Sequence, residues 1–232
     1  MNRSTVAVIL PALNEISCVE KVVEGFLREG TRVIVVDNGS NDGTGHAAQR
    51  AGAEVVYEKI RGYGSACLAG LSYLTSHPPQ IVVFADCDGT LDPHDIYNLI
   101  APIESGNADL VLGRRARVER GALPMHQKLG NTIACFLLQT FYGLAIRDIP
   151  PYRAGRWAFV TELGLSEQTY GFPIETVALA ARRGGIVKEV EVTYRSRATG
   201  RSKVAGSLSA SILAGVTMIT LLITLRFRRQ PR

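Results

Sequence analysis

The sequence predicts an α/β fold in which a doubly wound, mostly parallel sheet forms a single domain. Short apolar runs, which are typical of strands buried on both faces, alternate with amphipathic segments of helical length. This alternation contains no internal repeat and no low-complexity segment. A chain of 232 residues is long enough for one large α/β domain with a substantial core.

Three of the predicted strands end in polar side chains. The strands cover residues 5–11, 31–36 and 81–85. They are followed by Asn14-Glu15, which opens an amphipathic helix, by Asp37, and by the pair Asp86 and Asp88. Because ligands of open α/β sheets bind beyond the carboxyl ends of the strands, these side chains are the first candidates for a functional site.

The pair Asp86 and Asp88 predicts a divalent metal site. Residues two apart on an extended segment point to the same side, so both carboxylates can reach one cation. Hard oxygen ligands in small number suit Mg²⁺ or Mn²⁺. The alternative is an Asp-rich turn at a strand end. Asp92-Pro93, which follows, is typical of a helix N-cap with proline at the first helical position, and we favour that interpretation.

The rest of the chain continues the alternation, but its character changes after Gly113. Residues 114–124 contain four arginines and predict a mobile basic loop. Elsewhere we expect strands at 54–57, 109–112 and 190–194, and helices at 65–75, 93–103, 129–142 and 174–183.

Residues 204–225 contain no charged side chain and are followed by Arg226-Phe-Arg-Arg229. Their length allows a membrane span. Six Ser and Thr residues and positive charge on both flanks argue against a span and favour a helix, or a pair of helices, in the membrane interface. A core helix of a soluble protein is the alternative. The predicted organisation is therefore a domain at 1–203 and a membrane-associating tail at 204–232.

Charge and cysteine usage narrow the partners and the compartment. Residues 182–232 carry eleven Lys and Arg against two Glu, a net charge of +9, whereas the whole chain carries +5. A basic tail indicates an anionic partner, which could be membrane lipid, a phosphorylated substrate or nucleic acid. Nucleic acid is disfavoured, because the apolar tail lacks the interleaved aromatics typical of nucleic-acid binding. Four dispersed cysteines and the absence of a signal-peptide pattern predict a cytoplasmic protein associated peripherally with the inner face of the membrane.

Seven short motifs occur in a fixed order. They are Pro11-Ala-Leu-Asn14-Glu15, Val36-Asp37-Asn-Gly-Ser-Asn-Asp-Gly43-Thr44, Gly62-Tyr-Gly64, Asp86-Cys-Asp88, Gly113-Arg-Arg115, Tyr170-Gly-Phe-Pro-Ile-Glu175 and Arg197-Ala-Thr-Gly-Arg-Ser202-Lys203. Together they resemble glycosyltransferase family 2 with the GT-A fold, and more narrowly the dolichol- or polyprenyl-phosphate mannose and glucose synthases. The resemblance extends from Val8 to about Gly215.

The resemblance implies a nucleotide-sugar half at 1–113 and an acceptor half at 114–203. It implies that the donor is GDP-mannose or UDP-glucose and that Asp86 and Asp88 hold the metal at its diphosphate. The residues implied in donor binding are Pro11, Asn14, Glu15, Asp37, Gly62, Gly64, Asp86 and Glu175. Structural alternatives stay open for several of them: an Asx turn for Asp37, a turn glycine for Gly62, and first-turn helix positions for Glu15 and Glu175.

The implied acceptor is a polyprenyl phosphate. Its phosphate is anionic at neutral pH, so it can attack the sugar without a strong general base, but it must be held beside another polyanion by cations. The resemblance assigns acceptor binding to Arg115, Arg197, Ser202 and Lys203, and catalysis to Asp88, Arg115 and Arg197. A solvated basic surface is the alternative for these cations. Thr90 stands where many relatives have a Gln that reaches the metal.

The predicted function is therefore an inverting, metal-dependent transfer of mannose or glucose to a polyprenyl or dolichyl phosphate. Two alternatives stay open: a GT-A enzyme with a small soluble acceptor, such as a glycerate, and a nucleotide-sugar binding module without catalysis. A sugar-phosphate nucleotidyltransferase is disfavoured, because such an enzyme should begin with a Gly-rich strand and loop carrying a basic residue. This chain begins with Pro11-Ala-Leu-Asn14-Glu15 instead.

Overall fold

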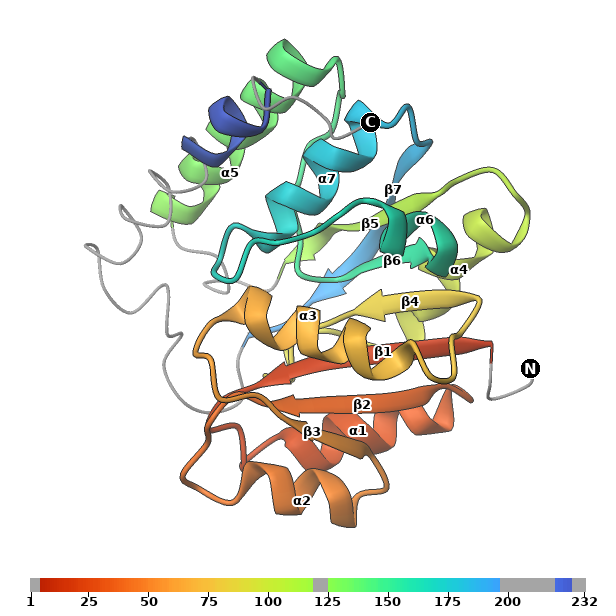
Figure 1. Cartoon of the computed structure of the whole chain (residues 1–232), viewed down its shortest axis with the longest axis vertical. Coiled ribbons are helices and arrows are strands. Elements are labelled where there is room, and N and C mark those ends of the chain that lie inside the picture. Colours follow the sequence, from red (N-terminus) through yellow and green to blue (C-terminus); the bar gives the residue numbers. More distant parts are fainter. Residues whose placement is uncertain (1–4, 119–124, 197–219, 227–232) are drawn as a thin grey trace.

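A seven-stranded sheet crosses the whole molecule in the order β3-β2-β1-β4-β6-β5-β7 (Figure 1). The computed structural model describes residues 5–118, 125–196 and 220–226. The strands are β1 Val6–Ala12, β2 Arg32–Asp37, β3 Glu54–Tyr57, β4 Ile81–Phe84, β5 Leu110–Val118, β6 Arg153–Arg156 and β7 Val187–Tyr194. The helices are α1 Val19–Arg28, α2 Thr44–Arg50, α3 Tyr63–Leu74, the short 3₁₀ helix η1 Pro93–Asp95, α4 Ile96–Glu104, α5 Met125–Tyr142, α6 Trp157–Glu162 and α7 Phe172–Arg182.

The sheet is mixed, and its strands from β3 to β4 form the parallel part. In that part β2 pairs with β3 and with β1, and β1 pairs with β4, all in parallel. The pair β5 and β7 is also parallel. Strand β6 runs antiparallel to both of its neighbours, β4 and β5. The sequence did not predict β6, because Arg-Ala-Gly-Arg lacks the apolar run by which buried strands are recognised.

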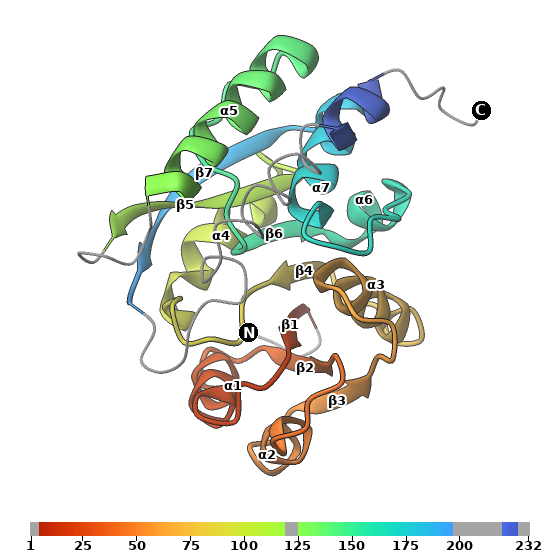
Figure 2. The ribbon, with the colours of Figure 1, turned by 90° about the vertical axis from the view of Figure 1, so that its left-hand side faces the viewer.

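Helices cover both faces of the sheet (Figure 2). Helices α1, α2 and α4 share one core cluster with the sheet, whereas α3, α5, α6 and α7 pack against its other face. The apolar face predicted for α1 is the buried one, since Val19, Val22, Val23 and Phe26 are all buried. Fully burying a side chain of this size contributes about 1.5–3 kcal/mol, so the period of these residues accounts for where α1 lies.

Strand β5 is longer than the sequence predicted. We expected a strand at 109–112 and a mobile loop from Arg114, but β5 continues to Val118. Its second half pairs with β7, up to the register position that joins Val118 and Tyr194, with an irregularity between Arg115 and Arg117. The prediction of a loop is therefore wrong for residues 114–118, because β7 supplies hydrogen-bond partners that the arginine-rich sequence does not reveal. Residues 119–124 lie outside the described part.

The end of the predicted tail packs on the protein. Residues 220–226 form a helical segment, drawn in dark blue beside α5 in Figure 1. Leu222 and Leu225 are buried in the cluster of α5 and α7, and the Tyr142 hydroxyl donates a 2.7 Å hydrogen bond to the Leu222 carbonyl. Leu222 and Leu225 are therefore core side chains, as the alternative of a core helix predicts, and the association of the tail with a membrane stays a prediction. Within the described residues no helix has the length and apolarity needed to cross a bilayer. Residues 204–219 lie outside them.

Candidate active site

The three strand ends that the sequence singled out lie side by side. Strand β1 is the central neighbour of β2 and β4, with Ala12 opposite Asp37 and Ile9 opposite Phe84. All three strands run in the same direction, so the segments that follow them meet at one edge of the sheet. This edge brings together Asn14, Glu15, Asp37, Asp86 and Asp88, as the sequence predicted from the strand ends. Pro11 is a half-buried residue of β1, opposite Val36.

Hydrogen bonds join the loop after β1 to the loop after β2. Asn14 adopts a left-handed backbone conformation, with φ at 52°, and its Oδ1 accepts a 2.9 Å hydrogen bond from the Asn41 amide. The Asn14 amide donates to the Ser40 hydroxyl at 3.0 Å, and the Glu15 amide donates to Thr44 Oγ1 at 2.9 Å. A non-glycine residue with positive φ costs conformational energy, which these cross-loop bonds offset.

Asp37 organises the loop that follows its own strand. Its Oδ1 accepts a 2.7 Å hydrogen bond from the Ser40 amide, and its Oδ2 accepts one of 3.1 Å from the Gly45 amide. The turn considered as an alternative role for Asp37 is therefore present. A Cβ at Gly45 would lie 2.6 Å from Asp37 Oδ2, so this position requires glycine.

Asn38 has a part in the site that the sequence analysis missed. Its Nδ2 donates to the carbonyl oxygens of Glu58 and Ile60, at 3.1 and 2.7 Å. Its Oδ1 accepts a 2.8 Å hydrogen bond from the Gly62 amide. This one amide side chain fixes the Gly62 turn to the end of β2. Its position directly after Asp37 was the only signal available in the sequence.

Cys18 and Cys87 connect Glu15 with the aspartate pair. The Cys18 Sγ lies 3.5 Å from Glu15 Oε2 and 3.3 Å from the Cys87 carbonyl oxygen. Burial, followed by the charge of Glu15, raises the pKa of the Cys18 thiol to about 11. The thiol is therefore protonated at neutral pH and can donate a weak hydrogen bond. The four cysteines are free and buried.

Asp88 is held by Thr90. The Thr90 amide and its Oγ1 both donate to Asp88 Oδ1, at 3.0 and 2.6 Å, and Asp88 is only 7% exposed. Thr90 therefore orients the second aspartate of the pair. Two carboxylates at one strand end form a donor set that fits Mg²⁺ or Mn²⁺, whose remaining ligands are usually water and substrate phosphate. Among the described residues no group of three or more His, Cys, Asp or Glu is arranged so that all its members could hold one metal ion.

Asp92 is a helix cap, as the sequence predicted. Its Oδ1 accepts a 3.1 Å hydrogen bond from the His94 amide at the start of η1. Its Oδ2 pairs with Arg195 Nη2 at 2.5 Å, and the Arg195 amide donates to the Thr90 carbonyl at 2.8 Å. The end of β7 is thereby attached to the loop that carries the aspartate pair.

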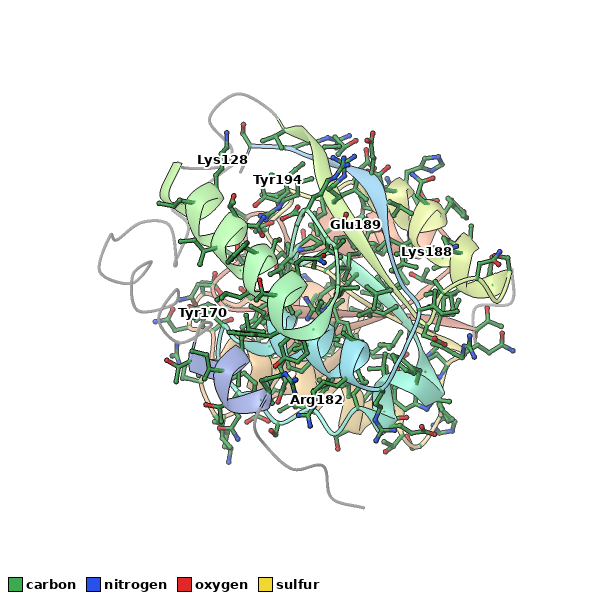
Figure 3. The ribbon with its side chains drawn as sticks, turned by 90° about the horizontal axis from the view of Figure 1, so that it is seen from above. Lys128, Tyr170, Arg182, Lys188, Glu189 and Tyr194 are labelled. Atoms are coloured by element: carbon green, nitrogen blue, oxygen red, sulfur yellow. The ribbon has the colours of Figure 1, made fainter. Side chains whose placement is uncertain are left out.

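Arg115 is paired with Asp148, a residue that the sequence analysis did not single out. Its Nε and Nη2 donate to the two oxygens of Asp148 at 2.9 and 2.6 Å, and its amide donates to Oδ2 at 2.9 Å. Burial opposes the charge of Arg115, but the hydrogen bonds and the charge of Asp148 outweigh it, so the pKa of Arg115 is raised. Glu189 of β7, which is labelled in Figure 3, in turn accepts hydrogen bonds from the Arg147 and Asp148 amides at 2.9 and 3.0 Å.

Tyr194 connects this ion pair with the aspartates. The Arg115 guanidinium carbon lies 5.5 Å from the centre of the Tyr194 ring. Burial, followed by the charges of Asp86 and Asp88, raises the pKa of the Tyr194 hydroxyl. The ring at the end of β7 therefore lies within reach of both the cation and the two carboxylates. The structure brings Arg115 to the same edge as the predicted metal ligands, and tertiary contacts alone create that proximity.

Gly62 and Gly64 allow two backbone segments to pack closely. A Cβ at Gly62 would lie 2.1 Å from the Gln168 carbonyl oxygen, and one at Gly64 would lie 2.0 Å from that of Glu167. The Ser65 amide also donates to the Gln168 carbonyl at 2.9 Å. These contacts explain why both positions are glycine without any ligand. Donor binding by Gly62 and Gly64 stays a prediction.

Glu175 stabilises the segment that packs on these glycines. It is 1% exposed, and its carboxylate accepts hydrogen bonds from the Ser166 amide, the Ser166 hydroxyl and the Glu167 amide, at 2.9–3.2 Å. The position in the first turn of α7 agrees with the structural alternative for this residue. A role for Glu175 toward the sugar stays a prediction. Arg197, Ser202 and Lys203 lie outside the described residues.

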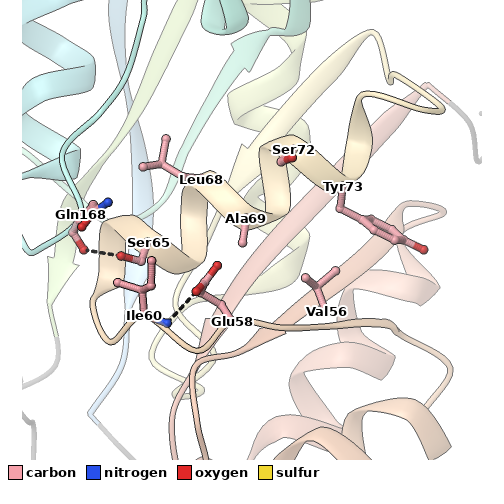
Figure 4. Close-up of a pocket in the computed structure, with 9 residues that line it drawn as sticks. All are labelled: Val56, Glu58, Ile60, Ser65, Leu68, Ala69, Ser72, Tyr73 and Gln168. Carbon is pink, nitrogen blue, oxygen red and sulfur yellow. Dashed lines mark hydrogen bonds between the residues drawn. The ribbon is translucent and has the colours of Figure 1, made fainter.

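A groove of about 490 Å³ runs along α3 and β3 (Figure 4). It is lined by Val56, Glu58, Ile60, Ser65, Leu68, Ala69, Ser72, Tyr73 and Gln168. None of the side chains at the carboxylate edge contributes to this lining. The groove borders the Gly62 turn instead, because the carbonyl oxygens of two of its lining residues, Glu58 and Ile60, accept the hydrogen bonds of Asn38.

A mixed sheet whose parallel part presents carboxylates beyond adjacent strand ends is consistent with the GT-A fold. The chain belongs to glycosyl transferase family 2, whose model matches residues 7–164. It is 39% identical to an uncharacterised glycosyltransferase of Mycobacterium tuberculosis, over 92% of this chain and 96% of the relative. It is 33% identical to the polyprenol monophosphomannose synthase of Mycolicibacterium smegmatis, over 86% and 81% of the two chains.

A solved structure shows the same fold. Glucosyl-3-phosphoglycerate synthase of Mycobacterium tuberculosis, in complex with Mn²⁺, uridine diphosphate and glucosyl-3-phosphoglycerate, superposes with a TM-score of 0.78. The match covers 97% of this chain and 81% of that chain at 23% identity, so it carries the fold alone. The protein is a glycosyltransferase.

Proposed function

We propose that this glycosyltransferase moves a hexose, mannose or glucose, from a nucleoside diphosphate to the phosphate of a polyprenyl lipid at a membrane surface. The observation that carries the proposal is the convergence of Glu15, Asp37, Asp86 and Asp88 at one sheet edge, with Arg115 beside them. The polyprenol monophosphomannose synthase at 33% identity supports the acceptor class. An undecaprenyl-phosphate mannosyltransferase of Micrococcus luteus, 29% identical over 91% of this chain and 92% of the relative, supports it too.

The donor occupies the edge formed by β1, β2 and β4. Glu15 and Asp37 offer carboxylate acceptors to the base and ribose, and Asn14 and Asn38 keep the two loops in place. Asp86 and Asp88 hold Mg²⁺ or Mn²⁺. Such an ion stabilises the negative charge that develops on the diphosphate as the leaving group departs. Thr90 fixes the direction of the Asp88 carboxylate, which prepares this carboxylate to bind the metal ion.

The acceptor phosphate approaches from the side of Arg115. An oxygen of the ionised phosphate forms the new bond to the anomeric carbon while the bond to the diphosphate breaks, and the electron pair leaves with the nucleotide. Attack on the face opposite the departing diphosphate inverts the anomeric centre. It needs no general base, because the phosphate is already ionised. Arg115, with its orientation fixed by Asp148, lowers the repulsion between the two polyanions. We propose that Arg197, Ser202 and Lys203 complete the acceptor side.

The outer face of α5 favours contact with a membrane. Leu129, Ile133 and Phe136 recur at helical spacing, and they are 62%, 40% and 67% exposed. Lys128, which is also exposed, lies on the same helix (Figure 3). An apolar stripe next to a cation is typical of helices that lie in the interface of an anionic bilayer. This face, rather than the buried Leu222 and Leu225, is the described surface that fits a lipid-linked acceptor.

Donor binding is tested by thermal-shift titration with GDP, UDP and their mannose and glucose conjugates, each with Mn²⁺ or with a chelator. A true donor raises the midpoint with increasing concentration, because ligand binding stabilises the native state. We expect a metal-dependent shift with one base only. No shift with any nucleotide would contradict the donor assignment, and binding without turnover would leave a non-catalytic module.

Acceptor class is tested by transfer assays that offer either a polyprenyl phosphate in anionic vesicles or 3-phosphoglycerate in solution. We expect product with the lipid, and co-sedimentation of the protein with the vesicles. Phe136→Ser should weaken sedimentation, whereas Ile186→Ser, which changes a side chain that is 52% exposed on another surface, should not. Transfer to the soluble acceptor alone would favour the second candidate, a soluble acceptor as in the glucosyl-3-phosphoglycerate synthase of the same fold.

A further inference from the structure

A buried guanidinium lies next to the candidate site, and neither the motifs nor the proposed mechanism uses it. Arg153 of β6 is 0% exposed. Within the described part of the chain, its Nε and Nη2 have no hydrogen-bond partner, and neither does the buried hydroxyl of Tyr63. Its Nη1 lies 3.4 Å from the carbonyl oxygens of Pro150 and Pro151, at the outer limit of a hydrogen bond. Burying a cation this incompletely bonded costs several kcal/mol, so the arrangement needs a physical explanation.

Two aromatic rings fix the orientation of this guanidinium. Its central carbon lies 4.8 Å from the centre of the Phe84 ring and 5.2 Å from that of Phe172. The two rings are 5.5 Å apart and inclined by 65°. Contacts with ring faces stabilise the cation, but they do not satisfy the N–H groups in the guanidinium plane. The Nε and Nη2 edge, which is the edge that binds carboxylates and phosphates in a bidentate manner, is therefore held in one direction.

The sheet places Arg153 close to Asp86. Strand β6 runs antiparallel to β4, with Arg153 opposite Phe84, and Asp86 follows Phe84 by two residues. The charges of Arg153 and Asp86 both influence the pKa values of two buried groups, the Cys67 thiol and the Tyr63 hydroxyl. Burial raises the pKa of the Cys67 thiol to about 12, with Arg153 lowering it and Asp86 raising it. Burial also raises the pKa of the Tyr63 hydroxyl, and here too the charge of Arg153 lowers the pKa while the charge of Asp86 raises it.

We propose that Arg153 is a positioning residue for Asp86, and that its guanidinium, which the β4–β6 register places beside this carboxylate, acts together with the Tyr63 hydroxyl to orient Asp86 toward the divalent cation and the donor diphosphate. Glu15, Asp86 and Asp88 are like charges gathered at one edge, and a permanently charged group behind them lowers their mutual repulsion. The inference rests on the metal site of the proposed function. It adds a role for β6, the strand that the sequence did not reveal.

The test measures Mn²⁺ binding directly, by titration of the full chain with the electron paramagnetic resonance signal of free Mn²⁺, with GDP or UDP present. Groups that support metal ligands typically change affinity by about 10–100-fold when they are removed. We expect Arg153→Met to weaken Mn²⁺ binding by about that factor. Arg153→Lys keeps the charge but removes the bidentate edge, and Tyr63→Phe removes only the hydroxyl. We expect about three- to tenfold losses for these two variants on the same basis.

The matched control is Arg156→Met, on the same strand. Arg156 pairs with Asp109 at 3.0 Å at the opposite end of β6 and is 47% exposed, so its removal should leave Mn²⁺ binding unchanged. Unchanged affinity in a folded Arg153→Met protein would overturn the inference. Should that variant not fold, unchanged affinity in Arg153→Lys would overturn it instead. Absence of Mn²⁺ binding by the wild-type protein would be a different result, because it would remove the proposed metal site itself.

Discussion

The part of the chain before residue 113 and the part after it position their charged side chains by different means. In the first part, Glu15, Asp37 and Asp86 follow adjacent parallel strands and meet because the strands are neighbours. In the second part, Arg115 pairs with Asp148, and Glu175 pairs with a backbone turn. Strand order alone explains the first group. The second depends on partners that are distant in the sequence, so a motif there does not reveal how its residues are bonded.

The largest effect should come from the first group. Asp88→Ala removes a predicted metal ligand, and we expect kcat/KM for transfer to fall by about a thousandfold, which corresponds to the loss of several kcal/mol of transition-state stabilisation. The matched control is Asp109→Ala, directly before β5, where the carboxylate pairs with Arg156 instead. Both variants should keep the circular-dichroism spectrum of the wild type. Full activity in Asp88→Ala would mean that the metal site lies elsewhere.

The second group should respond mainly in stability. The side chains of Arg115 and Asp148 are 14% and 8% exposed, and removing one partner of a buried ion pair costs about 3–5 kcal/mol. We expect Asp148→Ala to lower the free energy of urea unfolding by about 3 kcal/mol on that basis. Asp92→Ala, whose partner Arg195 is 47% exposed, should cost only about 1–2 kcal/mol, including the lost helix cap.

A double variant separates stability from acceptor binding. Arg115→Met with Asp148→Leu replaces the ion pair by apolar side chains and should recover part of the lost stability, since the Arg115 amide still loses its bond to Asp148. If Arg115 also holds the acceptor phosphate, the KM for the lipid phosphate should be higher in this double variant than in the wild-type protein. A normal KM would show that Arg115 serves the fold alone.

The contact between the two parts of the chain is tested at Gly64. A Cβ there would meet the Glu167 carbonyl oxygen at 2.0 Å, so Gly64→Ala should destabilise the protein by about 1–3 kcal/mol, as overpacking usually does. Gly130→Ala is the matched control, because no atom of the described residues outside the adjoining helix backbone and chain neighbours lies within 4 Å of a Cβ at that position. It should stabilise the protein by about 0.5–1 kcal/mol through helix propensity. Thermal unfolding measures both, and equal effects would contradict the packing role of Gly64.

The smallest effect concerns alkaline pH. The pKa of Cys18 is raised to about 11 and that of Cys67 to about 12, so the unfolded chain loses these protons at lower pH than the native protein. The stability they contribute is fully present below pH 9 and should decrease as pH rises through about 9–12. Urea unfolding at a series of pH values should show this decrease, with a shallower slope in Cys67→Ala. Equal slopes in the two proteins would exclude a contribution from this thiol.

Much of the fold and of the carboxylate edge could be predicted from the sequence. The apolar runs that became β1, β2 and β4 are recognisable because a strand buried on both faces needs apolar side chains at every position. Asp86 and Asp88 could be placed at the edge of the sheet because they directly follow such a run. The cap at Asp92 was predicted for a similar reason, since N-capping depends on neighbouring residues alone.

Tertiary structure decided the remaining features. Strand β6 has no apolar run, and it became visible only because β4 and β5 pair with it on either side. Arg115 and Asp148 are 33 residues apart in the sequence, and Arg153 lies opposite Phe84 on an antiparallel neighbour of β4. The sequence by itself determined which side chains follow the central strands, since that information is local. Contacts between distant segments, which only the folded chain creates, decide which cations are paired and which one is buried between Phe84 and Phe172.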